Sequence, residues 1–413
     1  MTSAIQTPNI PSAPPLSKVL VPVFLIVFTD IMGFGLMIPL LPFYAEHFGA
    51  FTVGLLLSVF ALCQLLAGPP LGQLSDRIGR KPVLVISQIG TLAGYILLAL
   101  SNTLWLVFAA RIIDGLTAGN ISVAHAYVSD NTAPEQRTKA FGIVGAAFGL
   151  GMLVGPSLGG LLARHSLTTP IWGACVLSAL SIVATAVLLP KGVKAEHKGP
   201  SESLLPVKPI LDCFRDPATG GIFFLLSLFY FVFNTFISGF ALFLAGRVTW
   251  GGEPIGPQTA GFMFAYAGLL NFLFQAIALG HLLRWFRERT LVFAGFLLMA
   301  IGFGALSLSH TVLATLAFLT LSHSGAAVLR PTITARLSKR VSPQRQGLVM
   351  GVNQSVMSIA SVLAPLVVGI LINHGLYVGW ALWMSVIAAA GAFGVSRISS
   401  MRDEPLVSQL PQV

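Results

Sequence analysis

The sequence predicts an all-α membrane protein with twelve transmembrane helices in two pseudo-symmetric six-helix bundles. Hydrophobic residues make up 55% of the 413 positions and charged residues only 9%, whereas a soluble domain carries about 25% charge. Twelve apolar stretches reach the roughly 20 residues that a helix needs to cross a bilayer. The second six stretches also repeat the first six, so most of the chain is expected to lie in lipid.

The apolar stretches divide the chain into five parts. Residues 1–18, rich in Pro and Ser, are expected to form a disordered tail. The first bundle covers 19–190, a polar linker covers 191–218, the second bundle covers 219–396, and a second tail covers 397–413. The expected spans lie at 19–41, 52–74, 83–101, 104–127, 138–162, 170–190, 219–245, 258–283, 290–309, 311–333, 347–372 and 376–396.

Lys and Arg are concentrated on one side of these spans. With both termini in the cytoplasm, inner tails and loops hold 20 of the 24 cations and outer loops hold only Arg164 and Arg247. Arg111 and Arg330 lie within or near spans. This positive-inside asymmetry predicts a multi-pass protein of the cell (inner) membrane with cytoplasmic termini. It also accounts for the net charge of +10, so nucleic acid is not an expected partner.

The two halves of the chain repeat each other. A shift of 208 residues places Gly72 on Gly280, and a shift of 209 places Pro156 on Pro365. A shift near half the chain length indicates that six helices were duplicated. Two six-helix halves with the same orientation are typical of secondary transporters, with the substrate site near mid-membrane where the halves meet.

Four motifs fall at defined places in this pattern. They are Gly72-x-x-x-Asp76-Arg77-x-Gly79-Arg80-Lys81, Arg111-x-x-x-Gly115-x-x-x-Gly119, Gly151-x-x-x-Gly155-Pro156-x-x-Gly159-Gly160, and Pro39-x-x-Pro42 after Asp30. With these motifs the sequence resembles the major facilitator superfamily, in particular its drug–proton antiporter branch and the tetracycline–proton antiporters. The resemblance implies export of an amphiphilic small molecule, such as tetracycline or another drug, in exchange for protons by alternating access.

The segment from Gly72 to Pro82 is expected to be a short surface loop, because unpaired polar groups are too costly in hydrocarbon. An anion such as Asp76 can stabilise a facing helix N-terminus, and the resemblance implies that this terminus lies near Gly347 when the cavity faces outward. Arg80 can then pair with Asp130. We interpret Gly72, Asp76, Arg77, Gly79, Arg80, Lys81 and Asp130 as a conformational latch. The alternative is a cluster that only fixes topology.

Small residues form a second motif in the span at 138–162. Gly151, Gly155 and Gly159 recur every four residues and therefore share one helix face, where glycine permits close helix packing. Pro156 removes one backbone hydrogen bond and allows a bend. The resemblance assigns these residues and Gly160 to a hinge and a seal between the halves, and plain tight packing explains the spacing equally well.

Charges inside the spans are candidates for proton coupling. Of 14 acids, only Asp30 and Asp114 fall deep within apolar spans, where facing lipid would be costly. We expect Asp30 to project into a water-filled pocket between the bundles and to carry the proton, since burial disfavours the charged form; a structural hydrogen-bonding role is the alternative. Arg111 and Asp114 can pair on one helix face. His323, 209 residues after Asp114, could titrate or simply pack.

Amide and aromatic side chains within the spans would suit a largely apolar substrate with several polar groups. The candidate cavity residues are Gln64, Asn120, His125, Tyr230, Asn234, Asn271, Gln275, Asn353 and Gln354. The span at 219–245 also carries eight Phe residues. They cover all sides of that helix, so most are expected to face lipid or neighbouring helices.

Other function classes have weaker support. No GxxxxGK[ST] occurs, so the proton gradient rather than ATP is the expected energy source, with no cofactor. Cys63, Cys175 and Cys213 are scattered and suggest neither disulfide nor metal. A proton symporter or uniporter of a small metabolite is the nearest alternative. The sequence contains neither HExxH nor GxSxG, which argues against an intramembrane enzyme. A membrane sensor is a third alternative, and it would bind its ligand without transporting it. Expected partners are a small-molecule substrate, protons and the lipid bilayer, with a monomer as the simplest assembly.

Overall fold

The computed structural model describes residues 16–40, 48–132, 137–190, 207–342 and 345–398. In these ranges, ten helices are long and apolar enough to cross a membrane. Two further spans are interrupted, one between α5 and α6 and one at a π-helical turn between α11 and α12. Together they make twelve spans, so the predicted fold class is confirmed.

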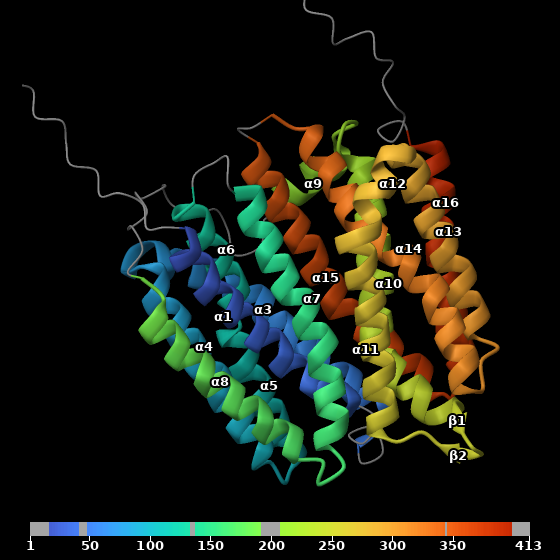
Figure 1. The fold of residues 1–413 in the computed structure, drawn as a ribbon, viewed down its shortest axis with the longest axis horizontal. Helices are drawn as coiled ribbons and strands as arrows, with labels where there is room; N and C mark the ends of the chain where they lie inside the picture. The colour runs from blue at the N-terminus through green and yellow to red at the C-terminus, as the bar shows by residue number, and fades with distance from the viewer. Residues whose placement is uncertain (1–15, 41–47, 133–136, 191–206, 343–344, 399–413) are drawn as a thin grey trace, which may run out of the picture.

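The helices follow the predicted order (Figure 1). The first bundle consists of α1 (Leu16–Met37) with the 3-10 turn η1 (Ile38–Leu40), α3 (Ala50–Ile78), α4 (Arg80–Ala99), α5 (Leu104–Thr117), α6 (Asn120–Asp130), α7 (Arg137–Leu162) and α8 (Thr169–Leu188). The short helix α9 (Val207–Arg215) precedes the second bundle. That bundle consists of α10 (Gly220–Arg247), the hairpin β1 (Thr249–Trp250) and β2 (Glu253–Pro254), α11 (Pro257–Leu273), the π-helix η3 (Phe274–Ala278), α12 (Leu279–Trp285), α13 (Glu288–Leu306), α14 (Val312–Lys339), α15 (Gln346–Asn373) and α16 (Tyr377–Arg397).

The two bundles use the same helix pairings. In the first, α1 packs on α7 and α8, α4 packs on α5 and α8, and α3 packs on α5. In the second, α10 packs on α15 and α16, α13 packs on α14 and α16, and α11 packs on α14. Each pairing of the first bundle thus has its counterpart about half a chain later. The repeat in the sequence is a repeat of packing.

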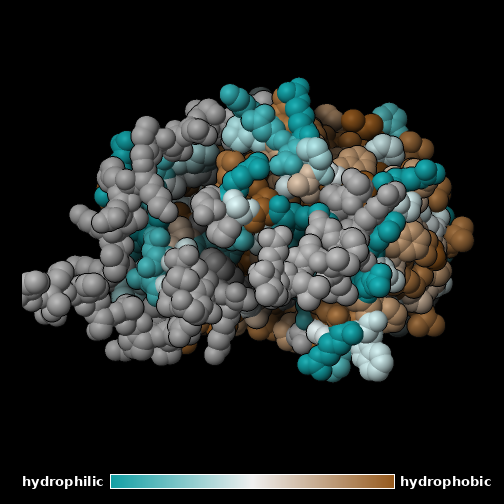
Figure 2. Space-filling model, turned by 90° about the horizontal axis from the view of Figure 1, so that it is seen from above, coloured by the Kyte–Doolittle hydropathy of each residue, from teal (hydrophilic) through white to brown (hydrophobic). Residues whose placement is uncertain are grey.

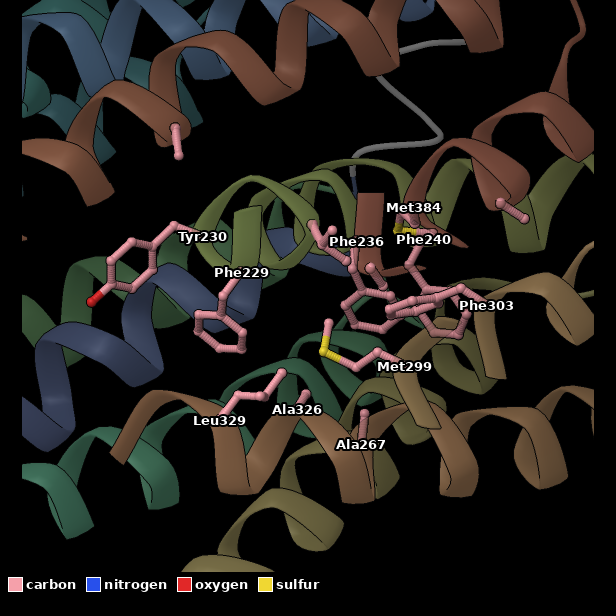
Figure 3. Packing of buried hydrophobic residues seen from close by; sticks show 14 of the residues in the cluster. Phe229, Tyr230, Phe236, Phe240, Ala267, Met299, Phe303, Ala326, Leu329 and Met384 are labelled. Carbon is pink, nitrogen blue, oxygen red and sulfur yellow. The ribbon is translucent and has the colours of Figure 1, made fainter. Parts of the chain in front are cut away.

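Aromatic side chains fill the core of the second bundle (Figure 3). Phe236 stacks on Phe240 with ring centroids 4.6 Å apart, and Phe264 meets Phe240 edge-on at 5.1 Å. Phe223 is also buried, whereas Phe224 is 46% exposed. The phenylalanines of α10 therefore divide between core and lipid-facing surface, and close packing rather than exclusion of water holds such a core in a bilayer.

Among the described residues, the main contacts between the bundles lie toward one end. The end at which α3 passes into α4 at Gly79 is called the basic end below, after Arg77, Arg80 and Lys81. At the opposite end α3 packs on α15 and α7 packs on α11. Gly54 lies against the Pro365 carbonyl there, and Gly261 lies against the Pro156 carbonyl. A Cβ at either glycine would collide with backbone, so these two related contacts require glycine.

Toward the basic end the bundles separate. A Cβ added at Gly142, Gly145 or Gly149 of α7, or at Gly351 of α15, would meet no atom within 4 Å. Figure 2 looks onto this end and shows polar side chains gathered on it beside a largely apolar flank. The structure is therefore closed at the opposite end and open at the basic end.

The outer surface matches a bilayer. Leu313 is 77% exposed and Phe393 is 63% exposed, as expected for lipid-facing side chains. Trp105 at the start of α5 and Trp285 at the end of α12 are more than four-fifths exposed. They lie at opposite ends of the molecule, where tryptophan anchors helices to the membrane–water interfaces.

Three local predictions were wrong in form. The expected loop from Gly72 to Pro82 is helical on both sides of Gly79, which turns the chain with φ +101°. Polar residues need only to leave the hydrocarbon, and helix ends can do so without unwinding. The spans expected at 104–127 and 258–283 are interrupted, because hydrophobicity does not report where a helix breaks.

The segment expected to be an interfacial turn at 210–214 belongs to the helix α9. Asp216 follows this helix and pairs with Arg345 at 3.4 Å, next to the start of α15. The Thr219 hydroxyl donates to the Cys213 carbonyl at 2.8 Å. Linker residues 191–206, Pro42 and most of both predicted tails lie outside the described residues.

We expect Gly54→Val to open the closed end. The added side chain collides with α15, and overpacking costs about 1–3 kcal/mol, enough to shift a balanced equilibrium roughly 5- to 100-fold. Spin labels at Leu167 and Leu376, with the native cysteines replaced, should move apart in pulsed electron paramagnetic resonance. Gly68→Val in the same helix is the control, since a Cβ at Gly68 meets nothing within 4 Å. Equal distance changes in both variants would contradict the assignment of the closed end.

Candidate functional site

A polar cluster inside the first bundle surrounds Asp30. The carboxylate Oδ1 lies 3.5 Å from the Ser181 hydroxyl of α8, and Asn120 of α6 lies beside it. Gln88 of α4 donates to the same Ser181 hydroxyl at 2.8 Å. Asp30 Oδ2 is buried and has no hydrogen-bond partner among the described residues. The carboxylate is therefore held from one side and open to a proton on the other.

Arg111 and Asp114 form a buried ion pair at 3.5 Å on α5. They are 8% and 4% exposed, and Thr91 also hydrogen-bonds with Asp114. The Arg111 guanidinium lies 3.6 Å from the Met37 sulfur and 5.9 Å from the centre of the Phe60 ring. Its Nε atom is buried without a partner. An ion pair with incomplete hydrogen bonding stabilises little, so its placement suggests a functional role.

Asp30 and Asp114 belong to one electrostatic group. Their charges repel each other, and Tyr95 of α4 interacts electrostatically with both. A Cβ at Gly33, one turn along α1 from Asp30, would lie 3.5 Å from the Tyr95 hydroxyl. The protonation of one acid therefore affects the other, and the two are best treated as a coupled pair.

The position of Asp30 corrects an expectation. We predicted that it projects into a water-filled pocket between the bundles, but all its polar neighbours belong to the first bundle. The residue as a whole is partly exposed, but its Oδ2 atom is buried. The sequence could place it in a span but could not show which face of α1 it occupies against α4 and α8.

The break between α5 and α6 is stabilised by side chains from two helices. Gln64 of α3 donates to the Ala118 carbonyl at 3.2 Å, and Ser87 of α4 both accepts from the Gly119 amide at 3.1 Å and donates to the Thr117 carbonyl. Unpaired backbone groups at membrane depth are costly. Gln64 was predicted to line the substrate cavity, but its hydrogen bond stabilises the break between α5 and α6.

A largely apolar pocket lies toward the closed end. It is lined by side chains of α1, α3, α4 and α5 and by Ile237 of α10, and Arg111 is its one charged lining residue. None of the predicted cavity residues lines this pocket. This pocket joins the Arg111–Asp114 pair to the boundary between the bundles.

Predicted polar residues of the second bundle form two groups. Tyr230 donates to Asn353 at 3.1 Å, and Ser361 donates to Asn234 at 2.9 Å, so both links join α10 to α15. Gln275 donates to Asn271 at 2.7 Å beside the π-helical turn of α11. The remaining predicted cavity residues, Gln354 of this bundle and His125 of the first bundle, are exposed.

His323 is buried among aromatic rings. Its ring meets Phe236 edge-on at 4.6 Å and Phe303 at 6.4 Å. Its polar neighbours are the adjacent Ser322 hydroxyl at 3.3 Å and the backbone of Leu319. These contacts are those of a packed side chain, the second of the two predicted alternatives.

The predicted latch residues gather at the basic end. Arg80 pairs with Asp76 at 2.6 Å and with Asp130 at 2.8 Å, joining the ends of α3, α4 and α6. Lys81 donates to the Ala186 and Leu189 carbonyls at the end of α8, a favourable place for a cation. The other latch residues, Gly72, Arg77 and Gly79, line the same turn, and Arg77 is exposed. The predicted contact between Asp76 and α15 near Gly347 was expected for the outward-facing conformation and stays a prediction.

The small-residue motif of α7 has two faces. Gly151, Gly155 and Gly159 contact α1, where a Cβ would meet Ile31, the Met32 carbonyl or the Leu36 carbonyl. Pro156 and Gly160 instead contact α11 of the second bundle, at Gly261 and at Pro257 and Gln258. The motif thus joins α1 closely to α7 and α7 to the other bundle.

Sequence reasoning missed several contributors to this site. Gln88, Ser181, Ser87 and Ser361 supply hydrogen bonds within the membrane. Isolated Ser and Gln residues occur throughout the spans, so their type alone is not distinctive. Among the described residues, no three His, Cys, Asp or Glu side chains converge so as to hold a metal ion.

Comparison with known proteins now adds to this geometry. The model of the Major Facilitator Superfamily matches residues 23–365 and 252–411. The chain belongs to the Major Facilitator Superfamily. It is therefore a membrane-embedded transporter of small molecules and not an enzyme. The predicted resemblance is confirmed.

Named relatives span nearly the whole chain. The class D tetracycline resistance protein of Salmonella ordonez is 33% identical over 371 residues, covering 85% of this chain and 89% of the relative. Multidrug resistance protein 2 of Bacillus subtilis is 25% identical, covering 85% and 88%. The crystal structure of the human organic anion transporter MFSD10 (TETRAN) superposes with a TM-score of 0.68 at 25% identity, covering 92% of this chain and all of that one.

We expect Asp76→Asn to reduce transport without reducing the amount of folded protein. The substitution removes the carboxylate charge that would stabilise a facing helix N-terminus, an effect of about 0.3–1 kcal/mol at a surface, so a two- to fivefold loss of rate is expected. Transport normalised to protein level, compared with Asp212→Asn on exposed α9, provides the measurement. Loss of folded protein in the Asp76 variant alone would instead support a purely structural cluster.

Proposed function

We propose that this transporter exports an amphiphilic drug, tetracycline or a similar compound, in exchange for protons. The names of the relatives support the substrate class, and the Asp30 cluster supports the coupling ion. The single observation that carries the proposal is the carboxylate of Asp30, which lies at membrane depth and forms no ion pair with any of the described residues. Such a group is a functional-site candidate by default.

The basic end is proposed to face the cytoplasm. Cytoplasmic loops are enriched in Lys and Arg, and this end holds Arg77, Arg80, Lys81, Arg336 and Lys339. On this assignment the structure is inward-open and both termini are cytoplasmic. The proposed location is the cell (inner) membrane, and the proposed assembly is a monomer.

In this proposal, alternating access depends on contacts that form and part in turn at the two ends of the molecule. In the inward-open state the drug enters between the bundles, while the contacts of Gly54 with Pro365 and of Gly261 with Pro156 exclude the outside. In the outward-open state these contacts part and the basic end closes, with Asp76 against the start of α15. In this exchange a proton binds to Asp30 from outside and is released to the cytoplasm.

Asp30 is placed to couple its proton to helix movement. Its neighbour Asn120 is the first residue of α6, directly after the break at Ala118 and Gly119. Gain or loss of the charge changes the hydrogen bonds that Asn120 and Ser181 offer. The break then provides a place where α6 can move relative to α5, and α6 carries Asp130, the partner of Arg80.

A symporter or uniporter of a metabolite is the less favoured transport mode. It explains the same fold, but it assigns no role to an acid at membrane depth in a chain whose relatives are named for drug resistance. The two modes differ in the sign of the flux that a proton gradient drives.

We expect inverted vesicles with an acidic interior to accumulate tetracycline, and Asp30→Asn to abolish the dependence on the gradient. Accumulation should fall by about tenfold or more, because an amide carries no titratable proton. Asp30→Glu is the matched control and should retain part of the activity. The measurement is uptake with and without a protonophore. Unchanged gradient dependence in Asp30→Asn would exclude Asp30 as the carrier, and no effect of the gradient on wild type would exclude antiport.

A further inference from the structure

The apolar pocket beside Arg111 has no role in the mechanism above. Three of its lining residues, Val53, Leu56 and Leu57, belong to α3, and Ile237 comes from α10 of the second bundle. A concave, mostly apolar site with a few polar groups is the usual form of a small-molecule site. The pocket is therefore a candidate site for a ligand other than the proton.

Arg111 gives this pocket a polar wall whose own partners are weak. Its Nη2 atom contacts the Met37 sulfur at 3.6 Å, and a thioether is a weak acceptor. Its Nη1 atom lies 3.5 Å from Asp114, which is long for a hydrogen bond, and its Nε atom has no partner among the described residues. Only 8% of the residue is exposed. Buried donors that lack good acceptors are costly, so an added acceptor would be favourable here.

The charge balance decides which kind of acceptor the pocket can hold. Arg111 and Asp114 form a neutral pair, and every other lining side chain is uncharged. An anionic ligand would place an uncompensated negative charge among apolar side chains, which is costly. A cationic ligand would be repelled by Arg111. A carbonyl or ether oxygen supplies an acceptor without a charge, so the pocket suits a neutral apolar molecule that carries one.

The same pocket adjoins the contact that closes this end of the molecule. Gly54 of α3 lies against one carbonyl of α15, and the Ser58 hydroxyl donates to another at 2.7 Å. Val53 and Leu57, which directly precede these two residues, line the pocket. Across from them is Ile237, on a helix that also contacts α3 and η1. The wall of the pocket is therefore complete only while α10 stays against the first bundle.

We propose that this pocket binds a small neutral lipophile with one hydrogen-bond acceptor, and that the bound molecule holds the closed end shut. Its apolar part contacts α3 and Ile237 together, and its acceptor receives a hydrogen bond from the Arg111 guanidinium. Opening this end removes Ile237 from the wall, so the ligand binds the closed arrangement more tightly. A ligand shifts an equilibrium by such a difference in affinity. The inference does not depend on which drug is exported or on the coupling ion.

The first test is a binding measurement with acetophenone and with ethylbenzene, which has the same skeleton but no acceptor. Full-length protein in lipid nanodiscs is titrated by calorimetry, with empty nanodiscs to correct for partitioning into lipid. The double variant Arg111→Met, Asp114→Asn removes the cation without leaving an unpaired acid. It should weaken acetophenone binding about tenfold, as expected for a lost hydrogen bond to a charged group, and leave ethylbenzene binding unchanged.

A second pair of variants tests the place of binding without altering the ion pair. Ile237→Trp fills the pocket and should abolish binding of both probes. Phe224→Trp, on the 46% exposed side chain of the same helix, is the matched control and should change neither affinity. Equal weakening of both probes in the Arg111 and Asp114 double variant, or unchanged acetophenone binding in Ile237→Trp, would overturn the assignment of the site.

The second test measures the closed end itself. Gly261→Ala loosens the other contact between the bundles, at the Pro156 carbonyl, and changes no lining residue of the pocket. With spin labels at Leu167 and Leu376 and the native cysteines replaced, saturating acetophenone should shift the distances in this variant toward the shorter, closed population.

Addition of Ile237→Trp to the labelled Gly261→Ala protein should remove this shift, because the pocket is then filled. Longer distances with acetophenone, or no change although it binds, would overturn the proposed effect on the closed end. Neither readout uses tetracycline or a proton gradient, so failure of the proposed export function remains distinguishable.

Discussion

The structure depends on one constraint, that hydrocarbon offers no hydrogen bonds. Each polar group within the membrane must find its partner inside the protein. Gln64 and Ser87 meet this need at the break between α5 and α6, and Ser181 and Gln88 meet it around Asp30. Several buried side-chain atoms of the described residues have no hydrogen-bond partner, and Asp30 Oδ2 and Arg111 Nε are informative among them because they belong to ionisable groups at membrane depth. They mark where the protein retains polar capacity that its packing does not require.

The same constraint separates structural from functional polarity in the second bundle. Tyr230, Asn234, Asn353 and Ser361 satisfy one another across α10 and α15. His323 is surrounded by rings, and its contacts explain its burial without any chemistry. The coupling residues are therefore concentrated in the first bundle. The duplicated fold holds chemically different interiors, and the bundle without internal acids is free to move against the one that has them.

Much of the fold could be predicted from the sequence, because apolar length, charge asymmetry and a repeat near half the chain each report a global property. The site was less predictable. Asp30, Arg111 and Asp114 could be singled out because charge in a span is rare, whereas Gln64 was given a role that its contact with the helix break does not support, and His323 was left open between titration and packing. Hydropathy shows which residues are inside the membrane, but it does not show toward which neighbour a side chain points. The helix breaks at Gly119 and at the π-helical turn could not be predicted either, because hydropathy does not show where a helix is interrupted.

The packing of α7 links the proton site to the movement of the bundles. Its glycines bring α1 so close that the two helices can shift only together, because a Cβ at Gly155 or Gly159 would meet the backbone of α1. Its other face, at Pro156 and Gly160, contacts α11 across the bundle boundary. Asp30 lies on α1 between Phe28 and Ile31, the two residues of that helix packed on Gly151. A change in the position of α1 is thus passed to the seal between the bundles through a single rigid pair of helices, without any chain of intervening side chains. Glycine packing and proton chemistry, which the sequence presents as separate motifs, act in the folded protein on the same helix.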